Sequence, residues 1–490
     1  MNVRTLLSKL ASVTVLRLGV AALGFGLFWL LSHQLSATEL GGFSVLMNTF
    51  LLLQALPLLG LHVHLIREVA ARPEQQAQEI SHALAFSSPF AVLLGIGVSL
   101  YGLVAADAAL RMPFVLLGLA MLPTAWTLVA ESALIGREQL RVLTWVNVLE
   151  SAWRLGGAGL AIWLGWGLSG VFATFLAGRV FSAVLYAQWG GLPTPKASMV
   201  TRAGLRLYLA QAPTYLAIGL VSAACSRLDM LLLSHLRGLE DVGVYAAAAK
   251  LYEASLMVST MALMIVYPVL ARLFASDRAQ FATMLARCVR WGLLLGVPLV
   301  LIGMALAPVL VHVLYAPKLW GAAPVLQALL LAAWLMAMDQ LLSGTTLAAQ
   351  AQRHDLQAMV VGLITLLALL MVLSPALGPL GTAWAVVAGL ALRVLWRIQW
   401  AQAYLQLPGL LSQAGRLALA ASASVAAFWA VNAGEVLTLS SPVLQTAMAL
   451  AVGLFVHVAV AVLTGAFDAR HRHDWAAWRH PVRHAPEVLS

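Results

Sequence analysis

The sequence predicts an all-α integral membrane protein with about 14 transmembrane helices, arranged as two six-helix lobes in parallel repeat followed by two C-terminal helices. Of the 490 residues, 62% are hydrophobic and 10% are charged, with a mean hydropathy of +0.90. That leaves too few polar groups to cover a water-soluble globule. Apolar stretches long enough to cross a bilayer as helices follow one another nearly end to end. A third observation, an internal repeat, divides these stretches into two sets.

The predicted spans begin close to the N-terminus. The first half contains spans near 10–33, 43–65, 82–105, 112–135, 143–165 and 170–190. The second half contains spans near 208–235, 241–271, 285–313, 323–347, 357–374 and 380–403, and two more lie near 416–432 and 443–465. The first stretch is too long for a signal-peptide apolar region and has no small-residue cleavage site, so we expect it to stay as a span.

The repeat is visible as two gapless matches. The string Leu-Leu-Ser-His closes one apolar stretch at residues 30–33 and another at residues 232–235, after which Gly41 falls on Gly243. A second match aligns later proline and glycine positions: Pro113 with Pro324, Gly167 with Gly378, Gly170 with Gly381 and Gly178 with Gly389. Six spans return the chain to its starting side, so the two halves are parallel rather than inverted. Such repeats are typical of carriers that rock two bundles around a central site.

Basic residues predict the orientation in the membrane. Twenty Lys and Arg residues lie at one set of span ends or in the tails, and only Arg111, Arg237 and Lys318 lie at the other. Since short loops rich in Lys and Arg stay in the cytoplasm, both termini are expected there. The predicted domains are an N-terminal lobe (1–195), a cytoplasmic linker (196–206), a C-terminal lobe (207–405), and the two extra helices with a basic tail (406–490). Topology and contacts with membrane lipids explain the net charge of +10 without nucleic acid.

Signals for enzymatic chemistry are missing from the sequence. Cys225 lies inside a span and Cys288 at a cytoplasmic end, so no disulfide is expected. No zinc motif, Walker A loop or dinucleotide fingerprint occurs, and the tail histidines are better explained as part of a basic segment on the inner leaflet. We therefore expect no enzyme activity, no metal and no cofactor.

Charged residues inside the spans are the candidate functional groups, because burying each charge in a bilayer is unfavourable in free energy unless the residue is paired or faces a water-filled cavity. Helical spacing places Glu150 beside Arg154 and Lys250 beside Glu253, so these two pairs can neutralise themselves. The other charged residues inside the spans are Arg17, Glu131, Arg179, Arg227, Asp229, Asp339 and Arg393.

Three of these arginines have no acidic residue three or four positions away on their own helix: Arg17, Arg227 and Arg393. Either they face a cavity that receives an anionic, preferably phosphorylated, group, or they pair with Asp229 or Asp339 from another helix. Asp229 lies two residues from Arg227 and points to a different face. It either compensates an arginine of another helix or exchanges a proton. Asp229, Glu253 and Asp339 are the coupling candidates.

The residues also resemble a known family. One string resembles the seventh-to-eighth-helix signature of polysaccharide biosynthesis flippases, the Wzx-type carriers of the multidrug/oligosaccharidyl-lipid/polysaccharide exporter superfamily. It runs from Arg227, Leu228 and Asp229 through Leu233 to Gly238, Glu240, Gly243, Tyr245, Ala247 and Lys250. The opening motif is similar at Leu40, Gly41, Gly60, Arg67 and Ala70, and later landmarks are similar at Ala322, Ala323, Pro324, Val325, Leu326, Leu380, Gly381, Thr382 and Ala383.

This resemblance implies a flippase that moves an undecaprenyl-diphosphate-linked oligosaccharide from the inner to the outer leaflet of a bacterial inner membrane. It implies Arg17, Arg227, Lys250 and Asp229 as cavity residues, with Arg393 added as a substrate-binding candidate on charge alone. Lipid-linked oligosaccharide, membrane lipids and polymer-assembly proteins are the implied partners. The near balance of intramembrane charges favours a neutral sugar unit. One alternative is a cation-coupled multidrug antiporter, which requires a carboxylate-rich cation site in the first lobe, whereas the first two spans contain no acidic residue. The other is a membrane glycosyltransferase or polymerase, which requires catalytic residues on a substantial outer loop, whereas every predicted outer loop is short.

Overall fold

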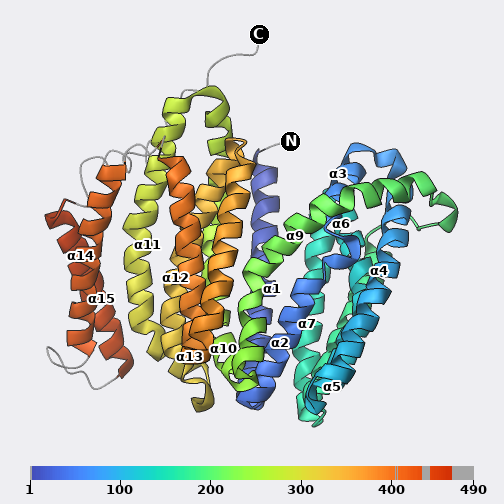
Figure 1. Ribbon diagram of the computed structural model, residues 1–490, viewed down its shortest axis with the longest axis horizontal. Coiled ribbons are helices and arrows are strands. Elements are labelled where there is room, and N and C mark those ends of the chain that lie inside the picture. The colour runs from blue at the N-terminus through green and yellow to red at the C-terminus, as the bar shows by residue number, and fades with distance from the viewer. Residues whose placement is uncertain (1–2, 403, 405–406, 433–441, 466–490) are drawn as a thin grey trace. The chain divides into compact units, whose positions relative to one another are not determined.

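Every regular element in the described part of the chain is a helix (Figure 1). The computed structural model describes residues 3–402, 404, 407–432 and 442–465. Residues 190–201 form the connector between α8 and α9. The elements before this connector are α1 (Val3–Gln34), α2 (Ala37–Leu53), η1 (Leu56–Leu58), α3 (His62–Ala71), η2 (Pro73–Gln75), α4 (Gln76–Ala105), α5 (Ala108–Leu119), α6 (Met121–Gly136), α7 (Leu140–Trp163) and α8 (Gly167–Trp189). The remaining elements are η3 (Ala197–Met199), α9 (Arg202–Arg237), α10 (Leu239–Ser276), α11 (Arg278–Leu314), η4 (Pro317–Leu319), α12 (Ala322–Ala348), α13 (Gln352–Ala401), α14 (Leu407–Asn432) and α15 (Pro442–Leu463).

The all-helical membrane fold predicted from hydropathy is confirmed. Within the described residues, seven helical stretches are long and apolar enough to cross a membrane, judged by length and composition. Each predicted span coincides with helical residues, while the number of crossings stays a prediction.

The predicted span 43–65 is not one helix. It consists of α2 and α3, which are separated by the short η1 turn with Pro57 in its second position. Leu59 and Gly60 then take left-handed backbone angles, with φ of 48° and 77°. A side chain on Gly60 would also collide with the Tyr215 backbone on α9. Proline and two left-handed residues therefore end α2 and redirect the chain into α3.

The break in α13 lies between two predicted spans, 357–374 and 380–403. Gly378 has backbone angles that are not helical, with φ 59° and ψ −134°. Pro375 and Pro379 lie on either side of it in the sequence. Gly378 is the repeat partner of Gly167, which itself has a φ of 57° at the start of α8. The same left-handed glycine thus opens the last helix of each six-span repeat.

The chain divides into two compact units, each described by itself. The first comprises Met1–Ala254, Val311–Val325 and Met359–Gly389, and the second comprises Ser255–Leu310, Leu326–Ala358 and Leu390–Ser490. The predicted lobe boundaries stay a prediction.

The duplicated Leu-Leu-Ser-His strings of the first unit have matching local structures. The Ser hydroxyl at 32 donates to the Trp29 carbonyl, and the hydroxyl at 234 donates to the Leu231 carbonyl, each at 2.7 Å. In both copies the following histidine places Nδ1 2.9 Å from the same carbonyl oxygen. The repeat therefore preserves the same side-chain contacts to the backbone in both copies.

The N-terminal turns of α2 and α10 touch through their backbones. A methyl group on Gly41 would overlap the carbonyl oxygen of Leu239, and one on Gly243 would overlap that of Ala37. Since Leu239 and Gly243 are the repeat partners of Ala37 and Gly41, the contact is reciprocal. Glycine is needed in both copies because two backbones lie where a side chain would stand.

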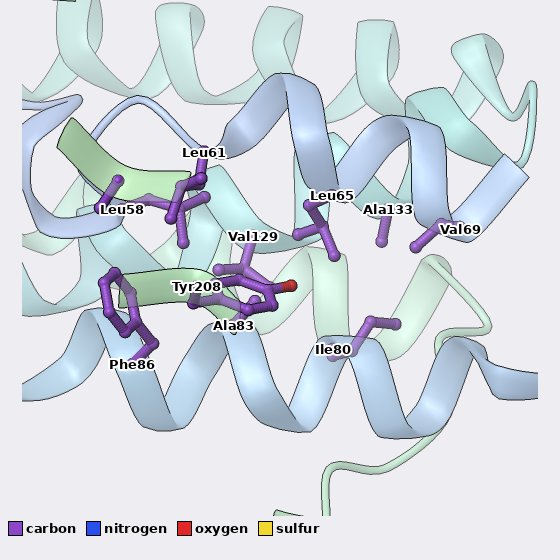
Figure 2. Packing of buried hydrophobic residues seen from close by; sticks show 11 residues of the cluster. Leu58, Leu61, Leu65, Val69, Ile80, Ala83, Phe86, Val129, Ala133 and Tyr208 are labelled. Carbon is purple, nitrogen blue, oxygen red and sulfur yellow. The ribbon is translucent and has the colours of Figure 1, made fainter. Parts of the chain in front are cut away.

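A hydrophobic cluster ties the start of α9 to the helices of the first repeat (Figure 2). The ring of Tyr208 lies between Leu61, just before α3, and Leu65 of α3 on one side and Ala83 and Phe86 of α4 on the other. Its hydroxyl donates to Glu79 at 3.4 Å. The first turns of α9 are therefore anchored on α3 and α4.

In the second unit, α14 and α15 run side by side (Figure 1), and the Ser424 hydroxyl donates to the Gly453 carbonyl at 2.7 Å. Phe428 and Val431 of α14 pack with Ala449 of α15 and with Ala305 of α11. The two extra helices thus form a pair with its own contacts to α11.

Candidate functional site

A charged cluster joins α9, α10 and α2 inside the first unit. Glu253 accepts from Arg227 Nη1 through Oε1 and from Lys250 Nζ through Oε2, both at 3.1 Å. Arg227 Nη1 also donates to Asn48 Oδ1 at 3.3 Å. We call these four residues the Arg227 cluster. The local Lys250–Glu253 pair predicted from sequence is present, and Arg227 joins it from the neighbouring helix.

The Arg227 cluster combines partial exposure with excess positive charge. The side chains of Arg227, Lys250 and Glu253 are 27%, 32% and 42% exposed. Two cations share one carboxylate, so the three groups together carry one positive charge when all are ionised. A guanidinium whose charge is only partly neutralised can still bind an oxyanion in a bidentate manner.

Asn48 has a defined orientation in this cluster. It is almost fully buried, and its amide nitrogen donates to the Ser44 carbonyl at 2.9 Å while also contacting the Met230 sulfur. Its oxygen is therefore the atom that faces Arg227. The sequence offered no signal for Asn48, because the residue lies on α2, far from Arg227 in the chain.

Asp229 occupies a separate environment from Arg227. Its carboxylate accepts a hydrogen bond from the hydroxyl of Tyr245 on α10 at 2.6 Å, and Tyr245 is buried. The expected divergence of Arg227 and Asp229 is confirmed, since the two take different partners. The donor to the Asp229 carboxylate is thus a phenol.

A second charged cluster, in the second unit, contains Asp339 of α12 with Arg393, Arg397 and Asp355 of α13. Asp339 accepts from Arg393 Nη2 at 2.5 Å and from Arg397 Nη1. Arg397 also donates to Asp355 at 2.8 and 3.0 Å. We call these four residues the Asp339 cluster. Arg393 thus takes the paired alternative considered for it.

Burial distinguishes the Asp339 cluster from the Arg227 cluster. Arg397 and Asp339 are 2% and 1% exposed, and two cations face two carboxylates. Such balanced, desolvated groups leave little charge for a ligand, and removing one of them would leave a buried charge uncompensated. The sequence placed Arg397 at a cytoplasmic span end, whereas the structure buries it.

A third cluster lies among α6, α7 and α8. Glu150 pairs with Arg154, as the helical spacing predicts, and also accepts from Arg179 Nη1 at 2.9 and 3.1 Å. Arg179 further donates to Thr124 and Thr127 of α6. These contacts tie three helices of the first repeat together.

The remaining candidates lie elsewhere or outside the description. Arg17 is on α1, and its side chain falls outside the described residues, as do the tail histidines. In the part of the chain that the structure describes, no group of three or more His, Cys, Asp or Glu residues could hold a metal ion. Cys225 and Cys288 form no disulfide with each other.

Long apolar helices, an internal repeat and charged clusters within the spans define a multi-spanning membrane protein. The chain belongs to the polysaccharide biosynthesis protein family, whose model matches residues 6–274. The family resemblance noted in the sequence is thereby confirmed.

Three solved structures share the fold at low sequence identity. The lipid II flippase MurJ, in an inward closed conformation, is 13% identical with a TM-score of 0.75, covering 93% of this chain and 99% of its own. A multidrug resistance MATE family transporter of the MOP superfamily, in an inward-facing conformation, is 15% identical with a TM-score of 0.62, covering 80% of this chain and 98% of its own. An outward-facing conformation of such a transporter is 15% identical, with a TM-score of 0.58, covering 81% and 94%. No curated protein matches the chain in sequence.

Proposed function

We propose that this protein flips an undecaprenyl-diphosphate-linked oligosaccharide from the inner to the outer leaflet of a bacterial inner membrane, for the assembly of a cell-surface polysaccharide. The pyrophosphate and sugars pass through a central cavity while the lipid tail stays in the bilayer. Both termini lie in the cytoplasm. Membership of the polysaccharide biosynthesis family supports this class of substrate.

The observation that carries the proposal is the chemistry of the Arg227 cluster. Arg227 and Lys250 are partly exposed and exceed the acidic charge beside them. A pyrophosphate offers several oxygens to a guanidinium and an ammonium group at once. On its arrival, Glu253 would give up part of its contact with both cations, which provides a way to release the substrate again.

Alternating access of the two six-helix lobes is the proposed transport mechanism. The parallel repeat and the reciprocal contact of α2 with α10 support this mechanism. If the two repeats move apart where the N-terminal turns of α2 and α10 meet, the backbones around Gly41 and Gly243 separate. Polymer-assembly proteins would receive the substrate on the outer side.

The test is to replace Arg227 and Lys250 by Gln, singly and together. We expect normal amounts of protein in the membrane, at least about a tenfold loss of affinity for undecaprenyl diphosphate, and accumulation of lipid-linked intermediates on the inner leaflet. Mass spectrometry of extracted lipids measures the last effect.

Arg353→Gln is the matched control, because Arg353 is an exposed arginine at the start of α13 and outside the cluster. It should leave affinity and polymer output unchanged. Full polymer output in the Arg227/Lys250 double variant would contradict the proposal. Disappearance of both single variants from the membrane would make the cluster a structural element instead.

A further inference from the structure

A cavity of about 640 Å³ lies beside the connector between α8 and α9. One wall comes from α4 and α6, and the other comes from the connector and the first turn of α9. All of these segments belong to the first unit. The proposed transport pathway does not use this cavity.

Two hydrogen bonds from backbone amides of the connector to side chains of α4 fasten the connector beside the cavity. The amide of Lys196 donates to the Ser81 hydroxyl at 3.1 Å, and the amide of Thr201 donates to His82 Nε2 at 3.0 Å. The Thr201 hydroxyl then caps α9 by accepting from the Gly204 amide at 3.1 Å. The connector is thus latched to α4, and the N-terminus of α9 begins at the cavity wall.

The lining has an apolar part and a basic part. Leu84, Ala85 and Leu205 supply apolar surface, while Lys196 and Arg202 are exposed residues that line the same cavity. The positive end of the α9 dipole adds to their charge. An occupant with an alkyl portion and an anionic head would match both parts.

The beginning of α9 has the character of a helix at the membrane surface. Leu207 and Leu209 are about half exposed, and the exposed Arg206 lies between Arg202 and these apolar side chains. Exposed leucines next to arginines are typical of helices that lie in the interface between head groups and acyl chains. The excess of basic residues predicts that this end faces the inner leaflet, where anionic lipids meet them.

We propose that the cavity is a binding site for an anionic phospholipid of the inner leaflet. An acyl chain lies against Leu84, Ala85 and Leu205, and the phosphate contacts Lys196 and Arg202. Because the lipid bridges α4 and the start of α9, it strengthens the latch between the connector and the first repeat.

The experiment adds palmitoyl-oleoyl phosphatidylglycerol to the purified full-length protein in a nonionic detergent and counts retained lipid by native mass spectrometry. We expect one tightly retained phosphatidylglycerol. The Lys196→Gln, Arg202→Gln double variant should bind it roughly 10- to 30-fold more weakly, since each basic group near a lipid surface contributes about a factor of five. Both side chains are exposed, so the double variant should fold normally.

Two further variants separate a built site from general surface charge. Ala85→Phe fills the apolar part of the cavity without changing charge, and it should also abolish tight retention. Arg206→Gln removes a positive charge one turn further along α9, outside the cavity lining, and it should change retention less than twofold.

Equal retention of phosphatidylcholine, or an equal loss in Arg206→Gln and in the double variant, would overturn the proposal. So would unchanged retention in Ala85→Phe. Displacement of phosphatidylglycerol by millimolar inorganic phosphate alone would assign the site to a free anion and would also reject a lipid. Since binding is measured without flipping, these outcomes are independent of the proposed transport function.

Discussion

Arg227 and Arg393 are both intramembrane arginines whose acidic partner comes from another helix, yet their surroundings assign them different roles. Around Arg227, two cations share one carboxylate and the side chains remain partly exposed. Around Arg393, two cations face two carboxylates and the cluster is buried. Loss of charge should therefore affect substrate handling at Arg227 and stability in the Asp339 cluster.

The Asp339→Asn variant tests the structural role of the Asp339 cluster. It removes an acidic partner from both Arg393 and Arg397 and leaves Asp355 as the other partner of Arg397, and we expect a loss of about 3–5 kcal/mol in the free energy of unfolding. Thermal melts of the detergent-purified protein measure this effect.

Glu253→Gln is the comparison, since Glu253 is half exposed and should change stability by less than about 1 kcal/mol. If Asp339→Asn melts normally but no longer responds to an ion gradient, Asp339 acts as a coupling group and not as a structural partner.

Asp229 is the residue whose replacement separates coupling from packing. Asp229→Asn keeps an oxygen that can accept the Tyr245 hydroxyl, so we expect near-normal stability. If Asp229 carries a proton between states, the variant in everted vesicles should lose acceleration by an imposed pH gradient and keep slow downhill exchange. Unchanged gradient-driven flipping would remove Asp229 from the coupling mechanism.

Tyr245→Phe provides the matched structural change. It removes the hydroxyl that Asp229 accepts from and leaves a carboxylate short of a donor, which should destabilise the protein by about 1–3 kcal/mol. A melt as stable as that of the unaltered protein would mean that the carboxylate finds another donor.

Pairs on a single helix could be predicted from the sequence, while pairs between helices could not. The spacing of three or four residues was enough for Lys250–Glu253 and Glu150–Arg154, because helical geometry alone brings them together. The partner of Arg227 depends on how α9 packs against α10, and that of Arg393 depends on how α13 packs against α12. No spacing rule contains this information.

At the scale of elements, α9 combines a fixed start with a polar middle. Its first turns are latched to α4 and packed through Tyr208, whereas Arg227 pairs with α10 further along. The structure fastens the linker segment to α4 through the backbone amides of Lys196 and Thr201. We therefore expect α9 to bend further along, at Pro213 and Gly219, where a proline weakens the helix.

The α2–α10 contact predicts that glycine is required at both of its ends. Gly41→Ala and Gly243→Ala should each lower thermal stability by about 1–3 kcal/mol, because the methyl group would displace a backbone carbonyl.

Gly24→Ala is the control, since no atom within 4 Å would meet the added methyl group on α1. Alanine there should be neutral or slightly stabilising. Normal melts for both Gly41 and Gly243 variants would show that the two backbones can separate at little cost.

At the scale of the whole molecule, the distribution of basic residues predicts that the connector lies in the cytoplasm. A fusion of alkaline phosphatase after Val200 should be inactive, and a fusion of green fluorescent protein at the same position should be fluorescent. The matched outer position is a fusion after Ala106, in the turn between α4 and α5, where the activities should be reversed. Phosphatase activity after Val200 would reject the whole topology.

Hydropathy and the repeat were sufficient to predict the fold class, because both are properties of the linear sequence and need no knowledge of packing. The division of the span 43–65 into α2 and α3 was not foreseen. Prolines are often tolerated inside membrane helices, so Pro57 alone could not indicate a break. The left-handed angles at Leu59 and Gly60, and the approach of Tyr215, become visible only in three dimensions.

The reciprocal contact between α2 and α10 has the form of a twofold dimer interface. The same pair of positions meets the same pair from the other copy, as when two identical chains associate through one self-complementary patch. A six-helix ancestor carrying only the first copy could have buried Gly41 against a second molecule. On this view, gene duplication and fusion converted a contact between subunits into a contact within one chain, and each glycine has since been free to accept a different neighbour.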